Sequence, residues 1–390
     1  MDNGPVAGVT ARGARRWDSG HPWIYRSDVT TRPVIGAGVV RVTDNRKRHL
    51  GWALWSAQSE ISLRLLDRDP DATIDDDWWH AMIGQSAGRR IGLESVTNAY
   101  RIVHGEADGL PSLVVDRYDR WAVVQLMSAG LETCRDAIVE AVVNVTKADG
   151  VLARNDVSLR AKEGLQRETV VLRGEVPHEI EVSEYSLRYL AAPFTGQKTG
   201  AFLDQRENRN LTGEVARGRA LDCFSYHGSF SLHLARNADT VTALDSSAQA
   251  IERARINARL NDITNIEFVE ADVFQYLRGQ EVAGTQFDTI VLDPPAFAKS
   301  RHSLDASLRG YKEINMRAMR LLAPGGILYT ASCSFHLSKA LFLEMLGSAA
   351  ADSHRRIALR EVRGQPIDHP EILTIPETGY IKGALLQAAD

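Results

Sequence analysis

A chain of 390 residues, of which 44% are hydrophobic and 25% charged, has the composition of a soluble globular protein with two or three domains. It contains no apolar run of about 18 residues, which argues against a membrane span, and no signal-peptide pattern at its N-terminus. The three cysteines, Cys134, Cys223 and Cys333, are far apart. This excludes a disulfide framework or a cysteine-rich zinc site, so we predict no metal and a reducing, cytoplasmic location.

Charge is distributed unevenly along the chain. The net charge of −4 does not indicate a polyanionic partner for the molecule as a whole. The first fifty residues nevertheless carry a basic excess over Asp2, Asp18, Asp28 and Asp44, made up of Arg12, Arg15, Arg16, Arg26, Arg32, Arg41, Arg46, Lys47 and Arg48. Such an excess can be a phosphate-binding surface or an ordinary solvated one, and charge alone leaves both interpretations open.

Residues 1–75 predict a small all-β module. Apolar and polar residues alternate in Val39–Thr43 and Ile61–Leu65, as in half-buried strands, and Gly51–Trp55 is a third candidate. No long helical pattern interrupts these strands. The acidic segment 67–77 that follows predicts a connecting loop.

Residues 76–192 predict a central α+β domain that is distinct from both neighbours. The apolar spacing predicts helices over 78–93 and Leu131–Val145. Strands are predicted over 100–103, 112–116, 121–126, 150–153, 169–172 and 178–182.

Residues 193–390 predict a domain in which strands and helices alternate. Strands are predicted over 219–223, 240–244, 266–270, 287–292 and 326–330, and helices over 228–236, 247–261, from 273 onward and over 311–322. Regular alternation implies a Rossmann-like α/β domain, with a parallel sheet covered by helices on both faces. The ligand of such a sheet binds at the carboxyl ends of its strands.

Acidic residues at the first three strand ends indicate a nucleoside. Asp222 precedes a turn with Tyr226 and Gly228, where the missing side chain of glycine and a helix N-terminus favour close approach of an anionic ligand. Asp245 can accept both ribose hydroxyls, and Asp272 can accept from an adenine amino group. Each acid alone is more often a helix N-cap. Three on successive strand ends fit adenosine, and the missing glycines argue against the pyrophosphate of NAD.

The fourth strand ends in Asp293-Pro294-Pro295-Ala296-Phe297. The prolines stiffen this loop and remove two amide donors, and they project Asp293 toward the ligand. The segment resembles the Asp/Asn-Pro-Pro-aromatic motif of methyltransferases that act on nucleobase nitrogens or ring carbons. Its backbone carbonyls and the ring of Phe297 could grip and stack a flipped base. The alternative is a rigid turn between a strand and a helix.

The fifth strand leads into Ser332-Cys333-Ser334. A free cysteine is usually a small buried hydrophobic residue, but Cys333 falls just beyond a strand end that faces the same crevice as Asp293. A thiolate there could add to carbon 6 of a cytosine or uracil and make carbon 5 nucleophilic enough to attack a sulfonium methyl group. A base must then remove the proton from carbon 5. Cys134 and Cys223 are predicted to be packing residues.

With these residues assembled, the chain resembles the bacterial large-subunit ribosomal RNA methyltransferase I family along nearly its whole length. The matching segments are Ser19–Tyr25, His104–Tyr118, Gly196–Arg206, Asp293–Pro295, Ser332–Ser334, Asp368–Pro370 and Pro376–Gly383. The resemblance implies an N-terminal PUA domain, a central α+β domain and a C-terminal methyltransferase domain. It implies that S-adenosyl-L-methionine donates a methyl group to carbon 5 of a cytosine in large-subunit rRNA. A homodimer is a further expectation from the family.

The resemblance also implies roles for the residues at the strand ends. Asp245 and Asp272 are expected to bind ribose and adenine, and the Thr199–Arg206 segment and the Gly228 loop to enclose the methionine end. Arg206 could pair with the methionine carboxylate or form a salt bridge with a neighbouring acid. By the same resemblance, Cys333 is the nucleophile and Asp293 holds the cytosine ring nitrogen.

Departures from the family pattern leave alternatives open. Ala296 stands where the family usually has lysine, and His227 stands in a loop that usually reads Ser-Tyr-Thr-Gly-Gly-Phe. We predict that His227 is a hydrogen-bonding loop residue rather than a base, and the base that removes the carbon-5 proton is unassigned. One alternative is a guanine-N7 rRNA methyltransferase, in which the ring nitrogen attacks directly and Cys333 would have no catalytic role. A non-catalytic RNA-binding or ribosome assembly factor would not need the three acids, and the arginine-rich β module argues against a protein or small-molecule substrate.

Overall fold

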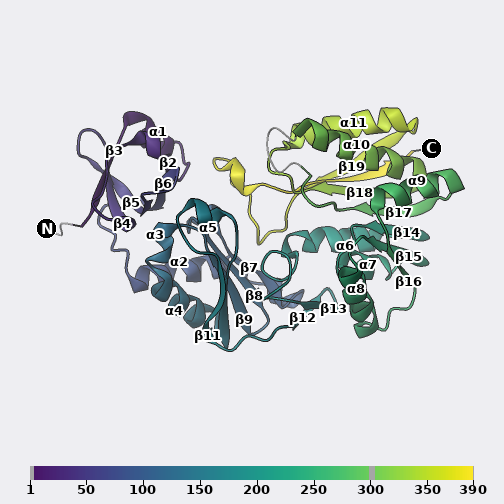
Figure 1. Cartoon of the computed structure of the whole chain (residues 1–390), viewed down its shortest axis with the longest axis horizontal. Coiled ribbons are helices and arrows are strands. Elements are labelled where there is room, and N and C mark those ends of the chain that lie inside the picture. Colours follow the sequence, from purple (N-terminus) through teal and green to yellow (C-terminus); the bar gives the residue numbers. More distant parts are fainter. Residues whose placement is uncertain (1–3, 298–303, 390) are drawn as a thin grey trace. The chain divides into compact units, whose positions relative to one another are not determined.

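The computed structural model describes residues 4–297 and 304–389, which fall into two compact units. The N-terminal unit comprises Met1–Ser183, Ala191–Leu203 and Ile367–Thr378, and the C-terminal unit comprises Glu184–Leu190, Asp204–Pro366 and Gly379–Asp390. Figure 1 shows the elements of both units coloured along the sequence. The division into three domains, with bounds at 75/76 and 192/193, stays a prediction.

The first part of the N-terminal unit is a six-stranded sheet with the order β2-β6-β5-β4-β1-β3. Its strands are β1 (Val6–Val9), β2 (Trp23–Tyr25), β3 (Val29–Thr31), β4 (Ala37–Thr43), β5 (His49–Ser56) and β6 (Ile61–Asp67). The three predicted strands are confirmed as parts of β4, β5 and β6. The prediction missed one helix, α1 (Ala11–Asp18). Its one buried large side chain is Trp17, so the sequence lacks the repeated apolar spacing that identifies longer helices.

The second part is a five-stranded sheet with the order β11-β10-β9-β8-β7. Its strands are β7 (Ala99–His104), β8 (Leu113–Tyr118), β9 (Trp121–Leu126), β10 (Gly150–Asn155) and β11 (Glu168–Gly174). Its helices are α2 (Asp76–Gly88), α3 (Ala129–Glu132), α4 (Arg135–Thr146) and α5 (Leu159–Lys162). The strands β12 (Ile180–Glu184) and β13 (Leu187–Ala191) form a two-stranded sheet where the chain first passes between the units. The α+β character predicted for this region is confirmed.

Two predicted helices of this region have wrong bounds. The helix predicted to reach residue 93 ends at Gly88, and Ile91 beyond it is almost fully exposed. The helix predicted over Leu131–Val145 is two helices, because Cys134 adopts a non-helical backbone (φ −106°, ψ 14°) between α3 and α4. Cys134 is therefore the N-cap residue of α4.

The C-terminal unit contains a seven-stranded sheet with the order β16-β15-β14-β17-β18-β20-β19. Its strands are β14 (Arg219–Cys223), β15 (Thr240–Asp245), β16 (Ile266–Glu270), β17 (Phe287–Leu292), β18 (Leu322–Ser332), β19 (Ile357–Arg363) and β20 (Lys382–Ala388). Its helices are α6 (Arg206–Val215), α7 (Ser229–Leu234), α8 (Ala248–Leu260), α9 (Val273–Ala283), α10 (Leu304–Leu321) and α11 (Lys339–Ser353). The five predicted strands are parallel, but β20 is antiparallel to β18 and β19. The sheet is thus mixed, and its last two strands were not predicted.

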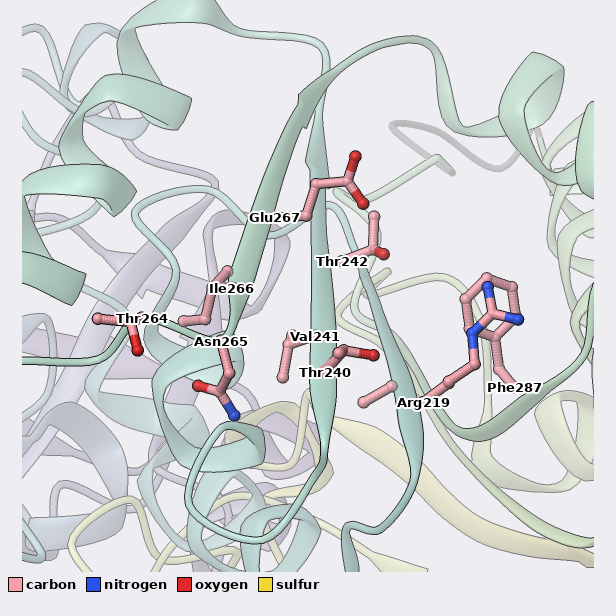
Figure 2. Close-up of a pocket in the computed structure, with 10 residues that line it drawn as sticks. Arg219, Thr240, Val241, Thr242, Thr264, Asn265, Ile266, Glu267 and Phe287 are labelled. Atoms are coloured by element: carbon pink, nitrogen blue, oxygen red, sulfur yellow. The ribbon is translucent and has the colours of Figure 1, made fainter.

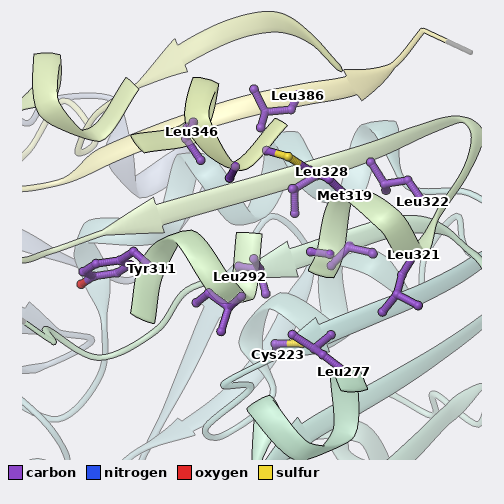
Figure 3. Packing of buried hydrophobic residues seen from close by; sticks show 14 of the residues in the cluster. Cys223, Leu277, Leu292, Tyr311, Met319, Leu321, Leu322, Leu328, Leu346 and Leu386 are labelled. Atoms are coloured by element: carbon purple, nitrogen blue, oxygen red, sulfur yellow. The ribbon is translucent and has the colours of Figure 1, made fainter. Parts of the chain in front are cut away.

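Alternate side chains of the strands pack on the two faces of this sheet. Ile290 and Leu292 of β17 join a cluster with α9, α10 and α11, whereas Val291 joins a cluster with α6 and α7. Figure 3 shows part of the first cluster, with Cys223 packed beside Leu277. Cys223 is fully buried, which confirms its prediction as a packing residue. The period of two, with helices on both faces, confirms the α/β class of this domain.

None of the helices in residues 4–297 and 304–389 is long and apolar enough to cross a membrane. In the same ranges, no group of three or more His, Cys, Asp or Glu side chains could hold a metal ion.

Candidate cofactor and catalytic site

The loop after β14 has an unusual backbone. Phe224 (φ 63°), Tyr226 (φ 48°) and Gly228 (φ 81°) all lie in the left-handed region, which glycine occupies without strain. Two non-glycine residues here cost on the order of 1 kcal/mol each. A side chain at Gly228 would place its Cβ 2.9 Å from the Cβ of Ala254 in α8, so this glycine is needed for packing. The loop thus adopts left-handed backbone conformations at three positions, although one of these three residues is glycine and the other two are not.

Asp222, at the end of β14, is fully buried. Its Oδ2 lies 2.6 Å from Oγ of Ser231, while Oδ1 is buried without a hydrogen-bond partner in the described part of the chain. Burial, helped by the charges of Asp293 and Asp245 and opposed by the Ser231 hydrogen bond, raises the pKa of Asp222 to about 7. A buried carboxylate oxygen with no partner is a position where a ligand donor would be favourable.

Asp245 and Asp272 each accept hydrogen bonds from the backbone. Asp245 accepts from the amides of Tyr226 and Ser247, at 2.9 Å to Oδ2 and Oδ1 respectively. Asp272 is the N-cap of α9 and accepts from the amide of Gln275 at 2.9 Å. A carboxylate oxygen can accept more than one hydrogen bond, so these contacts orient both acids and leave acceptor capacity for ribose and adenine.

His227 departs from its prediction as a hydrogen-bonding residue. Its ring stacks on Tyr189 with 5.1 Å between centroids, and within the described residues neither ring nitrogen has a hydrogen-bond partner. Burial and the charge of Arg209 lower the pKa of His227 to about 3, so the ring is neutral at physiological pH. The prediction was wrong for the ring, although the carbonyl of His227 does accept from Asn257.

The Gly196–Arg206 segment divides between the two units. In the N-terminal unit, the hydroxyl of Thr199 donates to Asp116 at 2.6 Å and lies 3.0 Å from the hydroxyl of Tyr118. In the C-terminal unit, Arg206 is fully buried at the start of α6, and its Nη2 lies 3.8 Å from Oε1 of Glu207. The acid beside Arg206 matches one of the two interpretations of this residue, and a role toward the methionine carboxylate stays a prediction.

Asp293 follows β17 and is oriented by Gln205. The Gln205 amide donates to Oδ1 of Asp293 at 2.9 Å, across 88 positions of sequence. The side-chain oxygen of Gln205, Oε1, in turn accepts from Nδ2 of Asn208 at 2.6 Å and from the hydroxyl of Tyr329 at 3.2 Å. The sequence analysis missed Gln205 as a functional residue, although it lies inside a segment that matched the family. Its spacing from Asp293 gave no signal.

The residues of the loop that follows Asp293 differ in how far they are buried. Pro294 is buried and Pro295 is exposed. The ring of Phe297 is half-buried and lies 4.6 Å from the ring of Tyr311 and 6.1 Å from that of Phe274, measured between centroids. Phe297 thus packs against the protein core in this structure, and a stacking contact with a base stays a prediction.

Cys333 lies just beyond the end of β18, as predicted, and is half-buried between two fully buried serines. The hydroxyl of Ser334 lies 2.8 Å from the hydroxyl of Tyr311, and its carbonyl accepts from Nζ of Lys382 at 2.7 Å. Strand β18 neighbours β17, with Thr330 paired to Leu292, so Cys333 and Asp293 follow adjacent strand ends. The sequence analysis missed Tyr311 and Lys382, which are 23 and 48 positions from Ser334.

A cavity of about 350 Å³ lies at the opposite end of the sheet. Arg219, Thr240, Ile266 and Phe287 line it, and they are the first residues of β14, β15, β16 and β17 (Figure 2). It is therefore separate from the acids and from Cys333, which stand at the carboxyl ends.

Comparisons with protein families agree with this geometry. Residues 110–373 match the model of the S-adenosylmethionine-dependent methyltransferase family, and residues 8–68 match a PUA-like domain. The protein is thus an S-adenosylmethionine-dependent methyltransferase with a PUA-like domain. The site fits this cofactor, because Asp222 offers a buried oxygen without a partner and Asp245 is oriented on the neighbouring strand.

Curated relatives define the family more closely. The chain is 38% identical to the ribosomal RNA large subunit methyltransferase I of Photobacterium profundum, over 93% of this chain and 94% of the relative. It is 39% identical to the protein of the same name from Aeromonas hydrophila, over 94% and 95%. The chain therefore belongs to the ribosomal RNA large subunit methyltransferase I family.

Solved structures of similar fold extend over almost the whole chain. A methyltransferase structure from Streptococcus mutans has a TM-score of 0.83 at 20% identity and covers 98% of this chain, with all of its own chain aligned. A methyltransferase solved in complex with SAH has a TM-score of 0.84 at the same identity and coverage. At this level of identity the likeness concerns the fold.

Proposed function

We propose that this methyltransferase acts on carbon 5 of a cytosine in large-subunit ribosomal RNA, with Cys333 as the nucleophile. The observation that carries the proposal is the placement of a half-buried thiol one residue beyond β18, next to the strand end that bears Asp293. Methylation at guanine N7 on the same fold would need no thiol at this position. The names of the relatives support ribosomal RNA as the substrate.

S-adenosylmethionine supplies an electrophilic methyl group when it is bound. Asp245 and Asp272 are proposed to accept from the ribose hydroxyls and the adenine amino group, with Asp222 and the loop through Tyr226 and Gly228 beside them. Their carboxylates are oriented before ligand binding by backbone amides or, for Asp222, by Ser231. Little conformational freedom is then lost when the cofactor binds.

The proposed chemistry begins at the sulfur of Cys333. The thiolate forms a bond to carbon 6 of the cytosine, while Asp293 holds the ring at its nitrogen. Carbon 5 becomes nucleophilic and forms a bond to the methyl group, which leaves the sulfonium sulfur. A base takes the proton from carbon 5, and its electron pair re-forms the ring double bond as the bond between carbon 6 and sulfur breaks. The carbonyls of Pro294 and Pro295 and the ring of Phe297 are proposed to contact the base.

Basic residues of the N-terminal module support an RNA partner. Arg12 and Arg48 are paired with Asp28 and Asp44, at 2.7 Å each. Four further cations of the first fifty residues are exposed, namely Arg15, Arg32, Arg46 and Lys47. An exposed basic surface favours phosphate contacts whose strength falls with salt concentration. A homodimer and a cytoplasmic location stay predictions.

The variant Cys333→Ala tests the covalent route, with Cys134→Ala as the matched control in the other unit. Deproteinised large-subunit RNA from a strain that lacks the gene is incubated with tritiated S-adenosylmethionine, and the labelled nucleotide is mapped. We expect Cys333→Ala to lose methyl transfer by at least about 1000-fold, as for the loss of a nucleophile, and Cys134→Ala to retain it. Methyl transfer by Cys333→Ala at the wild-type rate, or a label on guanine, would contradict the proposal.

A further inference from the structure

The hydroxyl of Tyr311 lies between the two loops that carry the proposed chemistry. Tyr311 is a fully buried residue of α10. Its hydroxyl oxygen accepts from the amide of Phe297 at 3.3 Å and lies 2.8 Å from Oγ of Ser334. One atom thus joins the segment that begins with Asp293 to the residue that follows Cys333.

The ring of Tyr311 makes a contact that is independent of its hydroxyl. It lies 4.6 Å from the ring of Phe297, between centroids, and packs within the hydrophobic cluster of α9, α10 and α11. Figure 3 shows Tyr311 among these side chains. Removing the hydroxyl alone would therefore leave the packing of the helix and of the Phe297 ring in place.

Ser334 is held from a second side by Lys382. Nζ of Lys382 donates to the carbonyl of Ser334 at 2.7 Å and to that of Tyr380 at 2.8 Å. The amide of Ser334 also donates to Oγ of Ser332 at 3.2 Å. Ser332 and Ser334 are fully buried on either side of the half-buried Cys333, and their hydrogen bonds help to fix this loop.

We propose that Tyr311 is a positioning residue that fixes the Asp293–Phe297 loop relative to Cys333. This inference rests on the proposed function, in which Asp293 holds the base that Cys333 attacks. A nucleophile must lie within about 3–3.5 Å of the reacting carbon, and a misplacement of about 1 Å can lower the rate on the order of 100-fold. Hydrogen bonds from both loops to the same Tyr311 oxygen set this separation before the base arrives.

The test is a double-mutant cycle on the full-length protein with Tyr311→Phe, Ser334→Ala and the double variant. Both substitutions remove the hydrogen bond between Tyr311 and Ser334, and Tyr311→Phe also removes the contact with the amide of Phe297. Because either change breaks the connection between the two loops, we expect each to lower kcat for RNA methylation about 10-fold and the double variant to be no more than about twofold worse than either. The KM for S-adenosylmethionine and the melting temperature are expected to change little. Tyr276→Phe is the matched control, because Tyr276 packs against the same cluster from α9.

Two results would overturn this inference. One is a kcat of Tyr311→Phe within twofold of the wild type; the other is a double variant whose loss equals the product of the single losses. Cys333→Ala is measured in the same series. Activity of Cys333→Ala would remove the proposed function, whereas an inactive Cys333→Ala beside a fully active Tyr311→Phe would remove the role of Tyr311 alone.

Discussion

The functional side chains at the carboxyl ends of the strands are held in two ways, one at β15 and β16 and another at β17 and β18. At the ends of β15 and β16, Asp245 and Asp272 are oriented by backbone amides, and Gln275, which orients Asp272, is three positions away. At the ends of β17 and β18, Asp293 and the Cys333 loop are held by side chains 23 to 88 positions away. The cofactor side is thus built largely from local chain geometry, and the nucleophile side from tertiary contacts.

Among the residues that hold these side chains, the largest effect is expected at Lys382, because its loss removes a donor from the carbonyls of buried Ser334 and half-buried Tyr380. An unsatisfied buried acceptor costs about 1–3 kcal/mol, so the Cys333 loop is expected to shift in Lys382→Met. Because a misplacement of about 1 Å can lower the rate about 100-fold, we expect a loss of kcat for methyl transfer of this order. The Kd for S-adenosylmethionine, measured by calorimetry, is expected to stay within twofold. Lys312→Met is the control, since Lys312 pairs with Asp352 on the surface. Weaker cofactor binding with an unchanged kcat would show that the two sides are not separable.

At Asp245 we expect cofactor binding to weaken while the Cys333 side of the site stays unchanged. In Asp245→Asn the side chain keeps its size, but one of the two oxygens that accept from Tyr226 and Ser247 becomes a donor. We expect the Kd for S-adenosylmethionine to rise about 30-fold, whereas alkylation of the Cys333 thiol proceeds at the wild-type rate. Cofactor affinity equal to that of the wild type would contradict the role of this acid.

Asp272 caps α9 and is proposed to contact adenine. The two roles can be separated, because serine also caps helices but has no carboxylate. Asp272→Ser is expected to keep the stability of the protein within about 0.5 kcal/mol, whereas Asp272→Ala loses about 1 kcal/mol with the N-cap. Both variants lack the carboxylate, so both are expected to bind S-adenosylmethionine about 10-fold more weakly. Normal cofactor binding by Asp272→Ser would mean that Asp272 only caps α9.

A pH dependence of stability is expected from Asp222. Burial raises its pKa from 3.8 to about 7, so between these values the folded protein binds this proton more tightly than the unfolded chain does. The stability that Asp222 contributes is fully present below about pH 4 and is lost as the pH rises through about 7. Asp222→Asn has no such dependence.

Urea unfolding from pH 4 to pH 8 checks this sign. The stability of Asp222→Asn relative to the wild type is expected to rise with pH, by at most about 1.4 kcal/mol per unit, and to level off above pH 7. His227 titrates in the opposite sense, but it is present in both proteins and cancels in the difference. A difference that does not change with pH would show that Asp222 stays ionised in the folded protein.

The same contrast explains which parts could be predicted from the sequence. The strands β14, β16 and β17 were predicted with their observed bounds. For β14 and β17 the reason is that parallel buried strands give apolar runs between turn residues, whereas β16 is a half-exposed strand at the edge of the sheet. The N-cap was the alternative to the predicted ligand role of Asp272, and Asp272 does cap α9 by accepting from a residue three positions away. The cause of these features lies within one element, although local patterns also gave wrong bounds for α2 and one helix in place of α3 and α4.

The missed features depend on contacts between distant segments. The pairing of Gln205 with Asp293, and of Tyr311 and Lys382 with Ser334, arises only when the sheet and its helices assemble. The antiparallel strands β19 and β20 follow the last predicted α/β unit and pair with each other and with β18. The site residues themselves were named from motifs and family resemblance, and their roles await the experiments above.

Release of tritium from carbon 5 of cytosine tests the central claim most directly. Large-subunit RNA labelled with tritium at this position in its cytidines is incubated with the enzyme and unlabelled S-adenosylmethionine, and tritiated water is counted. The account predicts one tritium released for each methyl group transferred, and none with Cys333→Ala. Methyl transfer without release of tritium would contradict attack by carbon 5 and with it the role of Cys333.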